Sequence, residues 1–207
     1  MIVNNFNILS TFFDKLDNPD DFYFVQIIQR RKDGNEKREK LIKNMYIHNQ
    51  KQFWDLKPEI IELCEMHNAR AYFWINPRNS KQIALDCVKH FMDLIIQDGC
   101  NSGYKVWDRV CGQQSAVGYP VNWIIDIDTY DTDYVLKINQ LIHQCRRVDG
   151  NPIKYIIPTK NGQHLITCKF DSHHFKQLCL ISHIDPPTIH KDNPTLLYYA
   201  ENERQGM

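Results

Sequence analysis

The chain has 207 residues, of which 43% are hydrophobic, and this composition is that of a globular protein rather than of a disordered chain. Lys and Arg total 25 and Asp and Glu total 25, so the zero formal net charge excludes an overall electrostatic attraction for nucleic acid or membranes. Any nucleic-acid site must therefore be local.

The seven cysteines include no CxxC pair, which indicates free, buried thiols in a reducing compartment. The spacing of His173, Cys179, His183 and His190 matches no standard pair of zinc-ligand knuckles. The N-terminus lacks the basic and apolar regions of a signal peptide, and no apolar run approaches the ~18 residues of a membrane span. We therefore expect a cytoplasmic protein with no membrane partner.

The first predicted elements form a basic hairpin. Residues 22–30 and 41–47 read as strands on either side of a Lys-Asp-Gly-Asn turn at 32–35. Such a cluster is either a ribbon that follows phosphates or a solvated face. The cluster comprises Arg30, Arg31, Lys32, Lys37, Arg38, Lys40 and Lys43. We take Arg30, Arg31, Lys37 and Arg38 as the candidate nucleic-acid contacts.

A helix, a strand and a second helix follow the hairpin. Pro58 is expected in the first turn of the first helix, where proline is tolerated, and residues 71–75 form a short apolar strand. Ser80 is the expected cap of the second helix. The apolar residues of that helix recur at helical spacing and predict one buried stripe. The stripe comprises Ala84, Cys87, Val88, Phe91 and Ile95.

The second half of the chain has the order strand, helix, strand, strand, helix, strand. These elements are expected at residues 121–128, 133–145, 153–157, 164–170, 172–180 and 195–199. This order is the split βαβ layout of RRM-like domains, an antiparallel sheet with helices on one face. The sequence thus predicts an α+β protein. Its parts are an N-terminal α/β module at 1–98, a Gly-, Ser- and Asn-rich connection at 99–120, and an RRM-like module at 121–207, packed together around a cleft.

Two aspartates lie at the end of the apolar strand at 121–128. Asp126 and Asp128 project from the same face, because side chains alternate along a strand. Paired carboxylates suit Mg²⁺ or Mn²⁺, which take one or two protein carboxylates together with water and phosphates. The alternative is that Asp126 is simply solvated while Asp128, Asp131 and Asp133 cap the next helix.

A histidine follows a tight turn in the next hairpin, Lys160-Asn161-Gly162-Gln163-His164. We expect Asn161-Gly162 to supply the positive φ of the turn, and the strand to hold His164 on rigid backbone. A lone strand histidine is more often structural. The functional interpretation of His164 therefore depends on its expected position beside Asp126 and Asp128 in one sheet.

The order of these elements is an apolar strand that ends in Asp-Ile-Asp, then a helix, then a hairpin that contains Gly-Gln-His. This order resembles the catalytic core of the archaeo-eukaryotic primase superfamily. The resemblance covers roughly residues 120–200. It implies that Asp126 and Asp128 bind the catalytic Mg²⁺ or Mn²⁺ and that His164 lies at the incoming nucleotide. The third motif of the family, an apolar residue followed by Asp, is matched best by Ile184-Asp185, with Asp192 as second choice. The Pro186-Pro187 that follows Asp185 departs from a continuing central strand.

The resemblance implies a DNA primase or polymerase, a metal-dependent nucleotidyltransferase of a mobile replication system. Its partners would be nucleoside triphosphates, a single-stranded or primed DNA template, and a separate helicase or replication protein. Arg78, Lys160 and Gly162 lie in turns beside the expected site and are candidate nucleotide contacts.

Two other functions fit the same sequence. An RRM-like sheet would bind single-stranded nucleic acid by stacking bases on Trp123, Tyr155 and Phe170, without a metal. A metal-dependent nuclease would use Asp126 and Asp128 to activate water. Carboxylates in the middle of a sheet face repel phosphate unless a cation intervenes, which separates the first alternative from the two metal-dependent ones.

Overall fold

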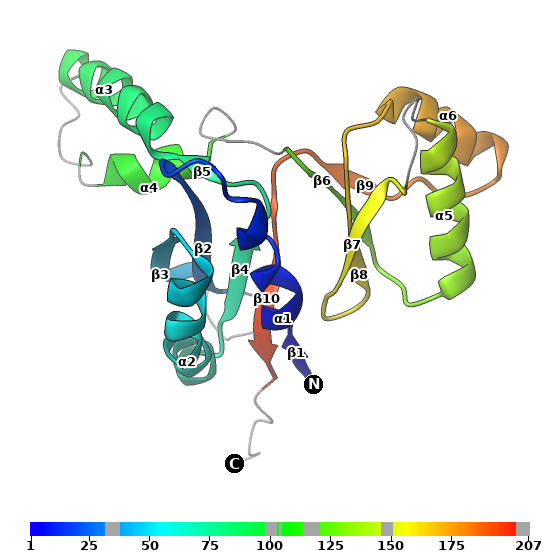
Figure 1. The fold of residues 1–207 in the computed structure, drawn as a ribbon, viewed down its shortest axis with the longest axis horizontal. Helices are drawn as coiled ribbons and strands as arrows, with labels where there is room; N and C mark the ends of the chain where they lie inside the picture. Colours follow the sequence, from blue (N-terminus) through cyan, green and yellow to red (C-terminus); the bar gives the residue numbers. More distant parts are fainter. Residues whose placement is uncertain (32–37, 98–102, 104, 114–120, 146–150, 202–207) are drawn as a thin grey trace.

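The structure is a computed structural model in which residues 1–31, 38–97, 103, 105–113, 121–145 and 151–201 are described. Within these residues the chain is an α+β protein with two antiparallel sheets and six α-helices, which confirms the expected fold class at that level. The two sheets lie side by side, each with its own helices (Figure 1).

The first sheet combines the N-terminal half of the chain with its last strand. Its strand order is β1-β10-β4-β2-β3, with β5 paired to the start of β2. The bounds are β1 Ile2–Asn4, β2 Asp21–Gln29, β3 Lys40–Ile47, β4 Arg70–Trp74, β5 Arg78–Asn79 and β10 Pro194–Ala200. The β2–β3 ladder confirms the predicted hairpin.

Helices cover both faces of the first sheet. The helix α2 (Gln50–His67) packs with α1 (Phe6–Ser10) and the short 3-10 helix η1 (Phe13–Lys15) against one face. The helices α3 (Ser80–Ile96) and α4 (Val106–Cys111) pack against the other. The alternation of strand β2 decides this arrangement, because its odd-numbered apolar residues face α2 and its even-numbered phenylalanines face α3.

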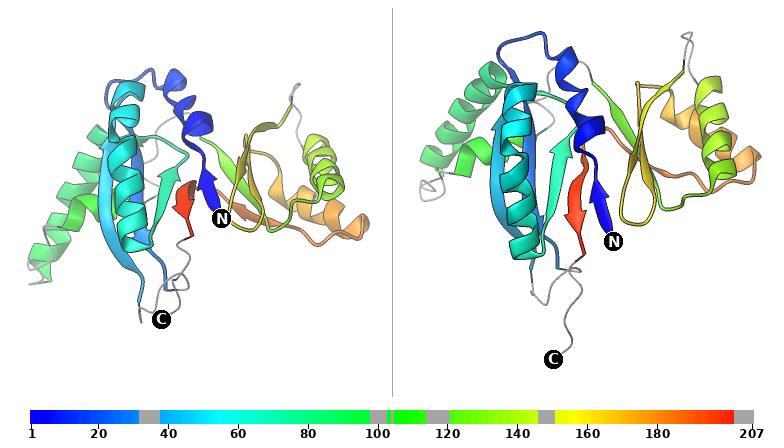
Figure 2. Two further views of the ribbon diagram at one scale, coloured as in Figure 1. Left: turned by 90° about the horizontal axis from the view of Figure 1, so that it is seen from below. Right: turned by 60° about the horizontal axis from the view of Figure 1, so that its bottom comes forward.

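The second sheet has the strand order β7-β8-β6-β9, all antiparallel neighbours. The bounds are β6 Trp123–Ile127, β7 Ile153–Pro158, β8 Gln163–Thr167 and β9 Thr188–His190. The helices α5 (Thr132–Gln144) and α6 (Ser172–Ile181) cover the face turned away from the first sheet (Figure 2).

The two faces of β6 have different partners. Ile125 and Ile127 are buried under α5 and α6, whereas Ile124 is buried in the same core as the helices of the first sheet. Asp126 shares the face of Ile124, because side chains alternate along the strand. The carboxylate therefore points toward the first sheet and away from α5 and α6.

The prediction for the last strand was wrong. Residues 195–199 were expected to complete the second sheet, but they belong to β10, between β1 and β4 in the first sheet. Strand β9 pairs with β6 instead, at the edge of the second sheet where residues 195–199 were expected. Alternating apolar residues show that a segment is a strand, but not which sheet it joins, and here Leu197 is buried in the core of the first sheet.

Three predictions for the first half were also wrong in detail. The helix α2 begins well before Pro58, because the Asn49 side chain accepts the Gln52 N–H, and Pro58 lies in the helix interior. Asn79, not Ser80, caps α3 by accepting the Gln82 N–H. The expected connection at 99–120 contains α4, and β1 and α1 were not predicted.

The predicted buried stripe of α3 is largely exposed. Cys87 is buried against the sheet, but Ala84, Val88, Phe91 and Ile95 are exposed. The helix faces the sheet with Ile83, Asp86 and Cys87 instead.

The cysteine prediction holds for the described residues. Cys64, Cys87, Cys111, Cys145 and Cys179 are free and buried, and Cys168 is free and half-buried. Burial raises the pKa of the Cys64 and Cys111 thiols to about 12, so both stay protonated and unreactive at neutral pH. Among the described residues, no helix combines the length and apolar character needed to cross a membrane.

Candidate active site in the cleft between the sheets

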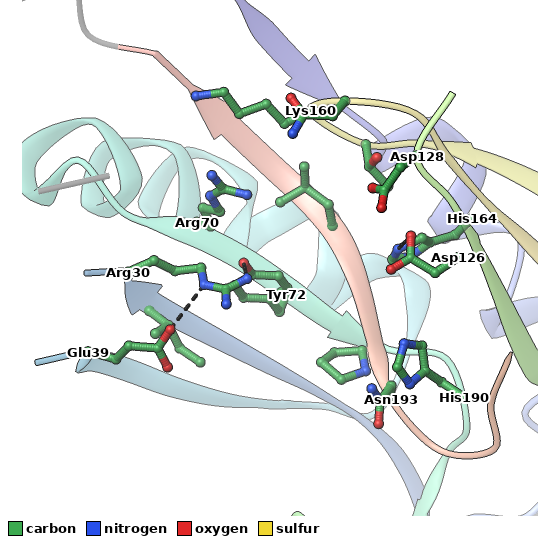
Figure 3. A pocket seen from close by; sticks show the side chains of 15 residues that line it. Arg30, Glu39, Arg70, Tyr72, Asp126, Asp128, Lys160, His164, His190 and Asn193 are labelled. Carbon is green, nitrogen blue, oxygen red and sulfur yellow. Dashed lines mark hydrogen bonds and ion pairs between the residues drawn. The ribbon is translucent and has the colours of Figure 1, made fainter. Parts of the chain in front are cut away.

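A cleft of about 450 Å³ lies between the two sheets. Its first wall comes from β2, β4 and β10 and carries Arg30, Arg70 and Tyr72. Its second wall comes from β6, the β7–β8 turn and β9. Figure 3 shows Asp126, Asp128 and His164 together on the second wall, opposite Arg30 and Tyr72. Acidic and basic groups thus face each other across a space of small-molecule size.

The structure confirms that Asp126, Asp128 and His164 lie together in the cleft. Asp126 and His164 are directly opposite each other on the β6 and β8 strands, so their side chains share a face. His164 Nε2 lies 3.3 Å from Asp126 Oδ1. Asp128 follows the last residue of β6 and is exposed at the mouth of the cleft.

A hydroxyl of the first sheet holds the His164 ring. Thr195 on β10 is fully buried, and its Oγ1 lies 2.8 Å from His164 Nδ1. An unprotonated Nε2 would turn its lone pair toward the Asp126 carboxylate, which is repulsive. Nε2 therefore carries a proton that is directed at Asp126, and Thr195 Oγ1 is the hydrogen-bond partner of Nδ1. The cleft thus receives an imidazole N–H of defined direction.

Gly162 packs against the backbone that carries Asp128. A Cβ at this position would lie 2.0 Å from Ile127 O, 2.6 Å from Thr129 N and 2.9 Å from the Asp128 carbonyl carbon. Close approach therefore requires the glycine. The predicted reason was wrong, because neither Asn161 nor Gly162 has a positive φ in this turn.

Arg30 contributes a charged group to the first wall. Its Nη1 lies 3.3 Å from the Tyr72 hydroxyl and its Nε lies 3.1 Å from Glu39 Oε1. Burial on its own lowers the pKa of Arg30, but the contacts with Tyr72 and Glu39 outweigh it and raise that pKa. The guanidinium stays charged and is held over the cleft.

Two further cations gather around the ring of Tyr199. The Arg70 guanidinium lies 4.7 Å and the Lys160 ammonium 5.0 Å from its centroid. Lys160 Nζ also donates to Glu201 Oε1 at 2.9 Å, and this bond raises the pKa of the ammonium group. Lys160 lines the cleft as predicted, with its charge anchored at the end of β10.

Arg78 does not reach the cleft, so its predicted role as a nucleotide contact was wrong. Its side chain is fully buried, and Nη2 lies 3.0 Å from Asp192 Oδ2. Asn76 joins the same network through Asp192 and Asn122. Both Nη groups of Arg78 donate to Asp192, while its buried Nε has no hydrogen-bond partner among the described residues, and the pair joins the first sheet to the segments that flank β6 and β10.

Asp185 does not reach the cleft either. It is exposed in the connection between α6 and β9, and its carbonyl accepts from the Tyr134 hydroxyl. The predicted third metal ligand is therefore not supported. The second choice, Asp192, is bound to Arg78. Instead, β9 places His190 in the cleft, beside Ile124 and on the face of Asp126.

The described part of the chain contains no group of three or more His, Cys, Asp or Glu side chains arranged to hold a metal ion. Asp126 and Asp128 alone present carboxylates from the second wall. This pair fits a Mg²⁺ or Mn²⁺ ion that completes its shell with water and substrate phosphates. It does not fit a site built entirely from protein ligands.

The predicted nucleic-acid contacts divide into three groups. Arg30 lies in the cleft, whereas Arg31 and Arg38 are exposed beyond the ends of β2 and β3. Lys37 lies outside the described residues. Arg30 therefore lies in the cleft, and its neighbour in the chain, Arg31, is exposed outside it.

The aromatic residues proposed for base stacking are not available for it. Trp123 and Phe170 are buried against each other under α5 and α6, with ring centroids 5.4 Å apart. Tyr155 packs on Phe12 at 4.6 Å and accepts from Lys15. The simple RRM-like binding module therefore loses its predicted stacking surface.

Sequence reasoning missed Arg70, Tyr72 and His190 in the cleft, and it missed the buried Thr195 that contacts His164. One signal was present, because Arg70 and Tyr72 alternate with the buried Ala71 and Phe73 along β4 and so mark its polar face. Thr195 gave no signal, since its contact with His164 depends on the sheet that β10 joins.

Comparison of the chain with protein-family models, curated proteins and solved structures found no match.

Proposed function

We propose that the chain catalyses template-directed nucleotidyl transfer, as a primase or polymerase does, in the cleft between its two sheets. The observation that carries the proposal is the placement of Asp126, Asp128 and His164 opposite Arg30 in one cleft. Carboxylates facing cations across a small space suit a ligand that carries both bound metal and phosphates.

The topology of the second sheet supports the same proposal. The strand β8 lies between β6 and β7, and the order of elements is strand, helix, strand, strand, helix, strand. This is the split βαβ arrangement of RRM-like and ferredoxin-like domains. We infer an RRM-like catalytic module whose helices cover one face and whose other face carries the site.

The residues of the second wall would bind the reacting end of the nucleotide. Asp126 and Asp128 would hold the divalent cation. When bound, such a cation stabilises the attacking and leaving oxygens of a phosphoryl displacement. His164, with its proton on Nε2, would donate to a phosphate oxygen that displaces the Asp126 contact.

The cations of the cleft would bind the rest of the nucleotide. Arg30 and Arg70 of the first wall and Lys160 of the β7–β8 turn bring three positive charges to the cleft, and each has a neighbour that already restricts its position. Little side-chain entropy is then lost when phosphates bind. Tyr72 is half-buried between these cations and presents its ring and hydroxyl to the sugar or the base.

The test is nucleotide incorporation on a primed DNA template with labelled nucleoside triphosphates and Mn²⁺. We expect the wild-type chain to extend the primer, and Asp126→Asn or Asp128→Asn to abolish extension. Asp185→Asn is the matched control, because it removes an exposed aspartate outside the cleft and should leave extension unchanged. A loss of extension in all three variants would instead support a metal site that includes Asp185.

The same gel separates the rival metal-dependent function. A nuclease would shorten the labelled strand in the presence of Mn²⁺ and would not need nucleotides. Shortening without extension would therefore replace the proposed activity with the nuclease. If ribo- and deoxynucleotides, with Mg²⁺ or Mn²⁺, gave neither product, the proposal would be overturned.

Template binding is expected at the exposed arginines that follow β2 and precede β3, Arg31 and Arg38. The double variant Arg31→Ala/Arg38→Ala removes two exposed charges outside the cleft, so the slope of log affinity against log salt should flatten by about 1.4 on single strands. Lys137→Ala/Lys176→Ala removes two exposed charges from α5 and α6 and is the control. An equal effect of both pairs would mean that the hairpin is only a solvated face.

A further inference from the structure

The exposed side of α3 is an apolar surface that no described part of the chain covers. Leu85, Val88, Met92 and Ile95 are 60%, 58%, 59% and 64% exposed. Their spacing of three, four and three residues places them in one row along the helix, as at the a and d positions of a heptad. The sequence pattern of a buried helix face is thus present on a face that the described residues leave exposed.

The opposite side of α3 packs against the first sheet and α4. Ile83 and Cys87 are buried against Phe22 and Phe24 of the sheet and against α4. Figures 1 and 2 show α3 at the end of the molecule opposite the second sheet in every view. A partner on α3 would therefore leave the cleft open.

The size of the surface matches what a stable interface needs. With Phe91 and Ile96, which are also exposed, the α3 side chains present on the order of 600 Å² of apolar surface, the largest patch expected on a monomer. Complete burial of two such surfaces would remove about 1,200 Å² from solvent, the lower bound for specific protein–protein interfaces.

The row of apolar residues is also complementary to itself. When two copies of α3 run antiparallel about a two-fold axis at position 90, Leu85 faces Ile95 of the second copy and Val88 faces Met92 of the second copy. All four positions are then filled by apolar pairs, as an isologous interface requires. The charge of Lys89 beside this row is compensated within each copy by Asp86, 3.1 Å away.

We propose that this face of α3 binds the α3 of a second copy of the chain, so that the protein is a two-fold symmetric dimer. The proposal does not depend on the chemistry of the cleft. The occupant is a second copy, because the apolar residues pair completely with themselves and the doubled area reaches that of a specific interface.

The test is the mass of the full chain in solution, measured by sedimentation equilibrium over a wide range of protein concentration. We expect twice the 24.6 kDa of the monomer, and Met92→Glu should shift the chain to monomer. Met66→Glu is the matched control, because Met66 is an equally exposed methionine on α2, at 66%, away from α3. It should stay dimeric.

A rescue experiment tests the antiparallel register. Leu85→Glu alone should give monomer, whereas Leu85→Glu/Ile95→Lys should restore the dimer, because each new carboxylate then faces the new ammonium group of the other copy and lies too far along its own helix from the one in the same copy. A double variant that stays monomeric would overturn the register. A wild-type chain that is monomeric at all concentrations would overturn the proposal and leave a different protein as the occupant of α3.

Discussion

Gly162→Ala is the substitution that bears most directly on how the site is built. The new methyl group would lie 2.0 Å from Ile127 O and 2.6 Å from Thr129 N, where ordinary contacts begin beyond 3.4 Å. The colliding atoms are backbone, so they cannot move aside as the end of a flexible side chain can. The β7–β8 turn must then separate from the end of β6, and Asp128 must shift with it.

The expected cost is at the upper end of that of overpacking, about 3 kcal/mol. Gly112→Ala provides the matched control, because its methyl group would come no closer than 3.5 Å to Arg109 O, at a residue with negative φ. Gly112→Ala should stabilise the protein by up to about 1 kcal/mol, because alanine lowers the conformational entropy of the unfolded chain. The two substitutions add the same methyl group and are expected to act in opposite directions.

The assay is urea unfolding followed by circular dichroism, with nucleotide incorporation measured where both variants remain folded. We expect Gly162→Ala to unfold at a lower urea concentration and to lose activity even when folded, because the carbonyl carbon of Asp128 lies 2.9 Å from the added carbon. If Gly162→Ala were as stable as the wild type, the turn would not be packed against β6 as described, and the account of Gly162 would fail.

Three other outcomes follow from individual contacts. Asp192→Asn leaves the buried Arg78 guanidinium without its carboxylate and should lower the free energy of unfolding by roughly 3–5 kcal/mol, measured in urea. A smaller loss for the double variant Arg78→Met/Asp192→Leu would show that the unpaired charge is the cause. The pKa of Asp171 is lowered by two backbone N–H groups at the start of α6, so its stabilising effect is present above its unfolded pKa and is lost as the pH falls through the folded pKa. Asp171→Ala should therefore lower the thermal midpoint at neutral pH, and a difference that persisted unchanged in strong acid would contradict this cause. Thr195→Val should reduce nucleotide incorporation by removing the partner of His164 Nδ1, whereas Thr195→Ser keeps the hydroxyl and should restore activity; equal activity in both variants would mean that the hydroxyl does not orient the ring.

Local pattern was sufficient to predict most strands and helices. Asp131 and Asp171 precede apolar residues at helical spacing, and both cap helices close to the predicted positions. The failures occurred where a local pattern fits two tertiary outcomes. Pro58 is tolerated inside α2 as well as in a first turn, and the apolar row of α3 looks the same whether a sheet or another molecule covers it.

The part of the candidate site that lies on neighbouring strands of one sheet could be predicted from the sequence. Asp126 and His164 face each other because β6 and β8 pair in register, and alternation alone placed both on one face. Arg78 could not be excluded from the sequence, since its burial depends on Asp192, which lies far along the chain. The role of Thr195 could not be foreseen for the same reason.

The strand β10 explains why the site depends on both sheets. Asn5 donates through Nδ2 to Leu196 O on β10 and to Pro158 O on β7, and so joins the first sheet to the hairpin that carries His164. One residue before Leu196, Thr195 reaches the imidazole itself. A separate module cut from residues 121–190 would keep the Asp126 and His164 pairing within its own sheet but would lose the group that orients the ring. The cleft therefore forms only because β10 pairs within the first sheet after the second sheet is complete. The orientation of the His164 ring depends on the packing of the two sheets, because Thr195 on β10 contacts it.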